Sequence, residues 1–172
     1  AKDGLEALEP LDPEKIHSFS ELLEAMRKTA FGGRRLGEAY ETLAAMIEDA
    51  DCKVVLTLSG AMTIAKMGKI ISTMIDRGMV QAIISTGALV AHGLSESVGK
   101  LHYRHEPSQS DEELFQKGYN RVYDTLEMES NLNYVEHVVS LTLKRINAEE
   151  PLSSNHLTRE LGRTLTEEFE GP

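Results

Sequence analysis

The sequence has one cysteine and no tryptophan, and aromatic residues make up only 5% of its 172 residues. The single Cys52 cannot form an internal disulfide, and it excludes a cysteine-rich zinc site. No apolar run approaches the length of a membrane-spanning helix. The charged stretch at residues 1–15 lacks the apolar segment of a signal peptide. We therefore expect a cytoplasmic protein that does not enter a membrane.

Basic residues are also in deficit, with 18 Lys and Arg against 28 Asp and Glu, for a formal net charge of −10. Such a field disfavours binding to nucleic acid or to an anionic membrane. The length suits a single domain with a real core of Leu, Ile, Val, Met and Ala. We expect an arm over residues 1–17, where Pro10 and Pro13 stand among acidic residues, and one domain over residues 18–172.

Two helices are expected after the arm. Ser18 and Glu21 form a capping-box pattern that predicts a short helix. The Phe-Gly-Gly at residues 31–33 should end it, and the next helix should run from about residue 34 to 49. The apolar residues that should face inward are Phe19, Leu22, Leu23 and Met26 in the first helix and Leu36, Tyr40, Leu43 and Ile47 in the second.

Residues 53–86 have the pattern of a βαβ unit. "KVVLTL" at 53–58 is apolar on both faces, which predicts a strand buried on both sides in a parallel sheet. After Ser59 and Gly60 the apolar period becomes helical, and Gly78 suits the end of that helix. "VQAIIST" at 80–86 is the second buried strand. The sequence thus indicates an α/β fold with a parallel sheet and a right-handed crossover.

The remaining elements are shorter. We expect a loop and a short helix over 87–99, a polar loop over 100–110, a helix over 111–118 and a strand over 121–126. An amphipathic helix should follow over about 132–146, and a last helix should begin near Ser153 or Ser154.

The two strand ends carry the best candidate site. Ser59 and Gly60 follow the first strand, and Ser85, Thr86 and Gly87 follow the second, so both loops should lie at one edge of the sheet. Unpaired N–H groups at a helix N-terminus there would favour an anion such as a pyrophosphate. The alternative is a pair of plain strand-to-helix turns, with small residues that let helices pack close to the strand ends.

The histidines give a weaker signal. His102 and His105 are three residues apart, but Pro107 and polar neighbours predict a solvated loop, and we expect no metal site. His92 lies just past the second loop, where it could act on a substrate or serve as a structural residue.

Three segments, "MRKTAFGGRRLGEAYETLAAMIEDADCKVVLTLSGAMTIAKMG", "DRGMVQAIISTGA" and "ELFQKGYNRVYD", together resemble the deoxyhypusine synthase family in order and spacing. The resemblance covers roughly residues 18–170 and implies the N-terminal half of such a protein. It implies a Rossmann-like parallel sheet with helices on both faces, an NAD cofactor, and a homotetramer with active sites between subunits. By position, the first NAD loop corresponds to Ser59, Gly60, Ala61 and Met62, and the second to Ser85, Thr86 and Gly87.

The resemblance also implies a reaction. The family oxidises spermidine with NAD, passes the aminobutyl group to an enzyme lysine, and delivers it to a protein lysine; some relatives use small amines instead. Where the family has an acidic pair that holds the polyamine, this chain has Ala91 and His92, which makes His92 a candidate substrate contact. The imine-forming lysine belongs to the family's C-terminal half, so we expect no catalytic residue in this chain and no activity from it alone.

Three hypotheses therefore remain open. The chain is part of an aminobutyl transferase acting on spermidine or a related polyamine, or part of a homospermidine-type enzyme acting on a different amine. The third is a non-catalytic subunit that completes an interface. The partner is either further copies of the chain or a complementary C-terminal chain.

Overall fold

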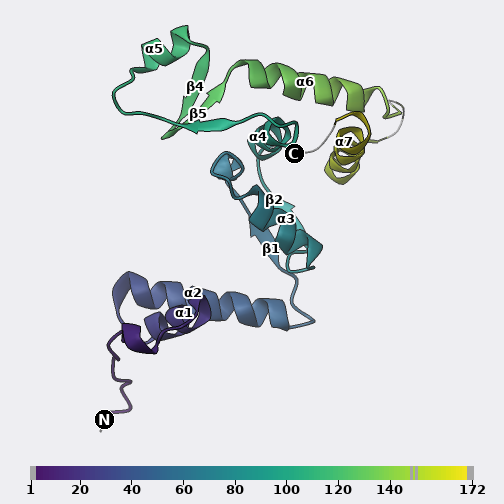
Figure 1. Cartoon of the computed structure of the whole chain (residues 1–172). Helices are drawn as coiled ribbons and strands as arrows, with labels where there is room; N and C mark the ends of the chain where they lie inside the picture. Colours follow the sequence, from purple (N-terminus) through teal and green to yellow (C-terminus); the bar gives the residue numbers. More distant parts are fainter. Residues whose placement is uncertain (1–2, 148, 150, 170–172) are drawn as a thin grey trace. The chain divides into compact units, whose positions relative to one another are not determined.

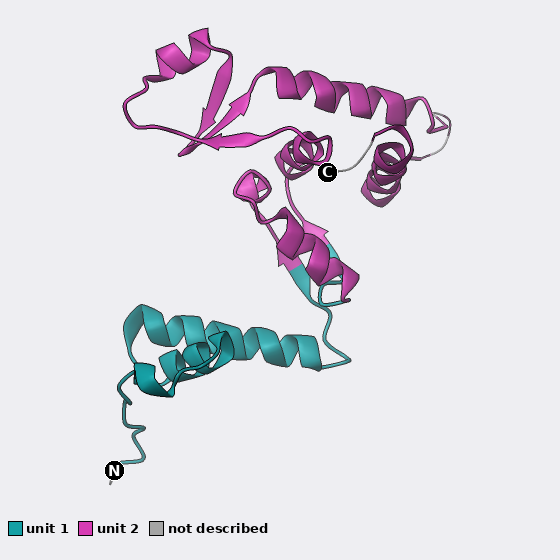
Figure 2. Ribbon diagram, in the orientation of Figure 1, with its two compact units in different colours: residues 1–55, 78–82 teal, residues 56–77, 83–172 magenta. Residues whose placement is uncertain are grey.

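A computed structural model describes residues 3–147, 149 and 151–169, a mixed α/β chain (Figure 1). The chain divides into two compact units: unit 1 comprises residues 1–55 and 78–82, and unit 2 comprises residues 56–77 and 83–172 (Figure 2). No helix in the described part of the chain is both long enough and apolar enough to cross a membrane.

Unit 1 is built on two packed helices, α1 (Phe19–Arg27) and α2 (Phe31–Glu48), preceded by a 3₁₀ turn, η1 (Pro13–Lys15). The predicted N-cap is confirmed, since Ser18 Oγ accepts a hydrogen bond from the Glu21 N–H at 3.2 Å. The Glu21 carboxylate reaches one residue further back than a capping box requires and accepts from the His17 N–H at 2.6 Å. A serine cap and a satisfied N-terminus thus fix the start of α1.

Two details of the helix prediction are wrong. Three residues that were predicted to face inward are exposed instead: Phe19 is 85% exposed, Leu36 52% and Leu43 41%. The Gly-Gly pair at 32–33 lies inside α2, and the break falls at residues 28–30. Of the glycines in α2, Gly37 is the one that packing requires: a Cβ there would lie 2.5 Å from the backbone nitrogen of Arg27, so the two helices touch backbone to backbone.

The strands β1 (Val55–Thr57) and β2 (Ala82–Ile84) pair with each other, and each changes unit within its length. Their hydrogen bonds advance in the same direction, from Gln81 N to Val54 O at 3.0 Å and from Leu58 N to Ile84 O at 2.9 Å, which confirms parallel pairing. The prediction that both strands are buried on both faces is wrong, because Val55 is 51% exposed and Ile84 is 62% exposed. Within the described residues this sheet has only two strands, too few to enclose either face.

The crossover between these strands differs from the prediction. A single 3₁₀ turn, η2 (Gly60–Met62), follows β1, and the helix α3 (Gly68–Asp76) begins only eight residues after Gly60. Lys66 adopts a left-handed conformation, φ 66°, which a continuous helix excludes. The predicted end is confirmed, since Gly78, φ 68°, follows the C-cap residue of α3.

Unit 2 contains a second, antiparallel sheet that the sequence analysis did not predict. Its order is β3-β5-β4, formed by β3 (His102–Arg104), β4 (Tyr119–Val122) and β5 (Thr125–Met128). The prediction of a loop over 100–110 is wrong at residues 102–104, and the single strand predicted over 121–126 is a hairpin. The predicted helix before the hairpin is confirmed as α5 (Asp111–Gln116).

The core of unit 2 lies where α4 (Gly87–Ser97), α6 (Ser130–Leu143) and α7 (Ser154–Glu168) meet. Leu94, Val138 and Leu161 are its buried apolar centre. Ser153 caps α7 by accepting from the His156 N–H at 3.1 Å, as predicted. The chain is thus a mixed α/β structure with a small parallel sheet; the Rossmann-like arrangement and the division at residue 17 stay predictions.

Candidate functional site

The loops that follow the two parallel strands are in contact, as the sequence predicts. A Cβ on Gly60 would lie 2.4 Å from Thr86 Oγ1 and 2.6 Å from Ala88 Cβ. Ser85 Oγ donates to the Leu58 carbonyl at 2.9 Å, which ties the end of β2 to the end of β1. The candidate residues Ser59–Met62 and Ser85–Gly87 therefore form one continuous edge of the parallel sheet.

This contact gives a different reason why position 60 is a glycine. The sequence analysis gave it the role of letting a ligand approach, but the neighbouring loop already fills the space that a side chain would take. The first loop also uses its own N–H groups, since Ala61 donates to Ser59 Oγ at 3.4 Å and Met62 donates to the Ser59 carbonyl at 3.2 Å. A single 3₁₀ turn in which Ala61 and Met62 already use their N–H groups is a poor anion site, and the expectation of a helix N-terminus at Gly60 is wrong.

The second loop has the geometry that the first lacks. Helix α4 begins directly after β2, and its N-cap residue Thr86 makes no side-chain cap. In the described part of the chain, no hydrogen bond engages the N–H of Gly87 or Ala88. A Cβ on Gly87 would meet no described atom within 4 Å. Two free N–H groups at the positive end of an 11-residue helix, facing open space, can receive an anion.

A cluster of polar side chains lies further along α4. His92 Nδ1 is 2.8 Å from Glu127 Oε2, and His102 Nε2 is 3.4 Å from Glu127 Oε1. Ser95 Oγ donates to Glu127 Oε1 at 2.7 Å. His102 and Glu127 are direct partners across the β3–β5 ladder, which brings their side chains to the same face. One helix and two strands thus meet at a carboxylate that is only 3% exposed.

Of the two histidines in this cluster, His102 has the more buried side chain. Its side chain is fully buried, and Lys66 Nζ lies 3.1 Å from its Nδ1 and 3.0 Å from Glu96 Oε1. Burial, and then the positive charge of Lys66, lower the pKa of His102. The imidazole is therefore held in its neutral form at physiological pH.

Of the three histidines in this region, the structure brings two together. His105 turns away, with Nε2 3.1 Å from the Gln109 carbonyl. Sequence reasoning missed Glu127 altogether, because it treated residues 121–126 as one strand. The signal was a hairpin with a turn at Tyr123 and Asp124, whose register sets Glu127 opposite His102.

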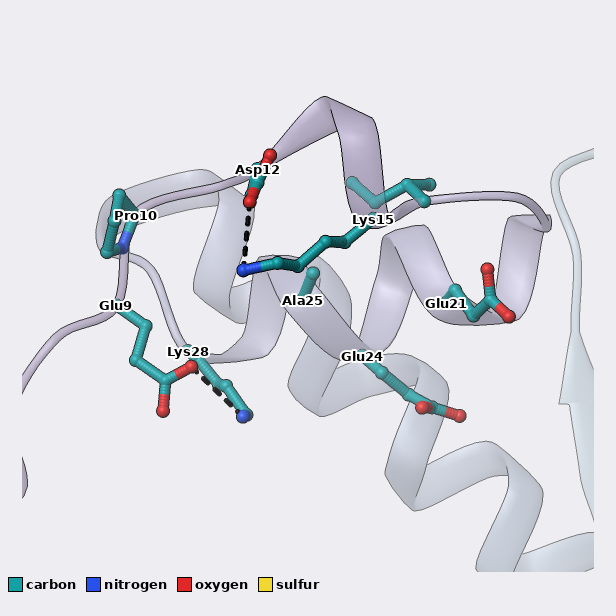
Figure 3. A pocket seen from close by; sticks show the side chains of 9 residues that line it. Glu9, Pro10, Asp12, Lys15, Glu21, Glu24, Ala25 and Lys28 are labelled. Carbon is teal, nitrogen blue, oxygen red and sulfur yellow. Dashed lines mark hydrogen bonds and ion pairs between the residues drawn. The ribbon is translucent and has the colours of Figure 1, made fainter.

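Two surface hollows, one in each unit, differ in the residues that line them. In unit 2, Lys66, His102 and Tyr123 help to line a hollow of about 650 Å³ beside the polar cluster. In unit 1, a hollow of about 290 Å³ lies between the arm and α1 (Figure 3). Both of its lysines already pair with carboxylates, Lys28 with Glu9 and Lys15 with Asp12, each at 3.1 Å. The hollow in unit 2 is the one connected with the candidate site.

The comparisons with known proteins agree with each other. The deoxyhypusine synthase family model matches residues 21–170. The chain is 34% identical over 156 residues to "Probable deoxyhypusine synthase 2" of Methanosarcina mazei, covering 91% of this chain and 45% of that protein. It is 37% identical over 121 residues to "Probable deoxyhypusine synthase 1" of Archaeoglobus fulgidus, covering 70% of this chain and 40% of that protein.

A "Deoxyhypusine synthase-like protein" of Elusimicrobium minutum is 29% identical over 168 residues, which is 96% of this chain and 44% of that protein. The chain thus spans less than half the length of these curated relatives.

Proposed function

Because this chain belongs to the deoxyhypusine synthase family, we propose that it is the N-terminal half of an NAD-dependent transferase. The reaction moves an aminobutyl group from spermidine or a related polyamine to an amine or lysine acceptor. The rest of the site comes from further sequence or from a complementary chain, and the assembly is a homo-oligomer, with a tetramer as the expected form.

The observation that carries this proposal is the contact between the two loops at the ends of the parallel strands. Ser59–Met62 and Ser85–Gly87 are the residues that would hold NAD, on the sheet edge where α/β proteins of the Rossmann type bind dinucleotides. The free N–H groups of Gly87 and Ala88 fit a pyrophosphate. NAD supplies a hydride acceptor for oxidation of the amine, and this chain supplies the cradle for its phosphates.

His92 is the substrate-side residue of this proposal. It is five residues beyond Gly87 on α4, and its side chain is 19% exposed. Its Nδ1 is engaged by Glu127, which fixes the ring and leaves Nε2 as the atom that can meet an amine. With Ala91 and His92 in place of the family's acidic pair, the site lacks two negative charges that would attract a polycation. The second candidate function is therefore a related enzyme that acts on a different amine.

NAD binding is tested with two glycine variants that we expect to fold equally well. Neither Gly87 nor Gly162 has a described atom within 4 Å of an added Cβ, and both lie in helices. In the protein as its gene encodes it, Gly87→Ala should weaken NAD at least fivefold by calorimetry, because the methyl group crowds the phosphates. Gly162→Ala is the matched control and should leave the affinity unchanged. Equal NAD affinity in both variants would remove the cofactor site from this loop.

The substrate is tested with a panel of amines and NAD. Turnover of spermidine with transfer to a protein lysine supports the leading proposal, and turnover of other amines alone supports the second. An intact mass matching 172 residues would direct the search to a partner chain that carries the lysine. Absence of any NAD-dependent turnover in the completed assembly would favour a non-catalytic subunit.

A further inference from the structure

The cluster at His92, His102 and Glu127 has the composition of a metal centre. One nitrogen from each imidazole and one carboxylate oxygen lie within 4.8 Å of one another. The three residues come from α4, β3 and β5, so packing of three separate elements holds them in place. In the transferase proposal Glu127 serves only to hold the His92 ring, and neither NAD binding nor amine transfer uses His102.

One atom of the cluster has no hydrogen-bond partner. His102 Nε2 is buried and accepts or donates no hydrogen bond within the described residues, although it faces Glu127. A buried polar nitrogen without a partner destabilises the folded state, and native proteins seldom keep one. An ion placed between His102, His92 and Glu127 would give that nitrogen a ligand bond.

The donor set selects a class of ion. Two imidazoles and one carboxylate suit zinc and similar transition metals, whereas magnesium and calcium prefer all-oxygen sites. Ligand atoms ~2.0–2.2 Å from a tetrahedral zinc are about 3.3 Å apart. The 3.4 Å between His102 Nε2 and Glu127 Oε1 already fits this spacing. The 2.8 Å between His92 Nδ1 and Glu127 Oε2 would open by roughly 0.5 Å once the shared proton leaves.

Ser95 gives the carboxylate a fixed orientation. Its hydroxyl is completely buried and donates to Glu127 Oε1 at 2.7 Å. This hydrogen bond fixes the plane of the carboxylate, and such outer partners tune metal affinity. A hollow of about 650 Å³ that Lys66 and His102 help to line lies beside the cluster.

Lys66 lowers the affinity of this cluster for a cation. An ammonium group has only hydrogen-bond donors, so at 3.1 Å it donates to His102 Nδ1 and places the ring proton on Nε2. Metal binding at Nε2 requires that proton to leave Nε2 and Nδ1 to carry the hydrogen. Lys66 must then turn to Glu96, which it already contacts at 3.0 Å. Its charge and its donors therefore both lower the affinity of the site.

We propose that His92, His102 and Glu127 bind one zinc-class divalent cation, with Ser95 orienting the carboxylate and Lys66 weakening the site. Each of these residues should change the metal affinity in a defined direction. Loss of a ligand weakens binding, while removal of the Lys66 charge strengthens it. A plain hydrogen-bonded network predicts no effect of Lys66 on metal, since it binds none.

The experiment is titration of the EDTA-dialysed protein with Zn²⁺ by calorimetry and with Co²⁺ by visible absorption, without NAD or amine. We expect one ion per chain, with affinity falling at least tenfold in Glu127→Gln. Lys66→Gln should bind at least threefold more tightly, because the amide removes the charge and its oxygen can accept from Nδ1–H. His105→Ala, which changes a histidine outside the cluster, is the matched control and should bind as the unchanged protein does.

Lys66→Gln keeps the test independent of folding defects. Lys66 is 47% exposed, so its replacement should leave the fold intact, and a circular dichroism spectrum like that of the unchanged protein checks this. Absence of stoichiometric binding in both the unchanged protein and Lys66→Gln would overturn the proposal. So would an equal loss in Glu127→Gln and His105→Ala, since it would place the ion elsewhere. Because no step of the titration involves NAD, its outcome is separate from that of the transferase proposal.

Discussion

Gly60→Ala tests the contact between the two loops. The added Cβ would lie 2.4 Å from Thr86 Oγ1 and 2.6 Å from Ala88 Cβ. Non-bonded carbon atoms prefer ~3.5–4.0 Å, so the loops would have to separate by roughly 1 Å. The third neighbour, Leu89 N at 3.3 Å, is backbone and cannot rotate away. The free energy of unfolding should therefore fall by about 1–3 kcal/mol, as in other overpacked cores.

Thermal unfolding followed by circular dichroism gives the measurement. For a chain of this size, a loss of ~2 kcal/mol lowers the midpoint by about 4–8 °C. Gly93→Ala is the matched control: it lies on the same helix as Ala88, and its Cβ would make only an ordinary contact, 3.5 Å from Thr63 Cγ2. Its helix position predicts no loss, and a gain of up to ~1 kcal/mol.

An unchanged midpoint in Gly60→Ala would refute the contact between the loops, and with it the shared edge on which the NAD proposal rests. A fall in Gly60→Ala together with an equal fall in Gly93→Ala would show general sensitivity of α4 instead. A larger side chain at this position, as in Gly60→Val, would not report on the cofactor. It would lower NAD affinity through disruption of the loops, whether or not NAD touches Gly60.

Three further predictions concern stability. Gly37→Ala should lower the free energy of unfolding by about 1–3 kcal/mol in chemical denaturation, since its Cβ would lie 2.5 Å from backbone atoms of α1; Gly32→Ala, in open space, should not. The pKa of His102 is lowered in the folded chain, so below about pH 6.5 the unfolded chain binds more protons than the folded one. The melting temperature should therefore fall as the pH drops below ~6.5. A pH profile unchanged by His102→Gln would contradict this. Ser110→Ala should cost about 1 kcal/mol and speed amide exchange in α5, whose capping box it removes; exchange at the rate of the unchanged protein would count against the cap.

The hydrophobic pattern was a sound guide to local structure. It predicted β1, β2 and most helices, because apolar periodicity and capping residues act over a few positions of the chain. It failed where the backbone departs from that periodicity, as at Lys66, whose left-handed conformation delays α3. It also failed at His102, where a strand that pairs across 25 residues with Glu127 has no local signal.

The candidate site divides in the same way. The family resemblance and the two small-residue loops were readable from the sequence alone, because both depend on the order and spacing of residues along the chain. The contact of Gly60 with Thr86, and the meeting of His92, His102 and Glu127, were decided by tertiary structure. Such contacts arise only when strands pair and a helix packs beside them, and no short window of sequence encodes the register that brings those atoms together.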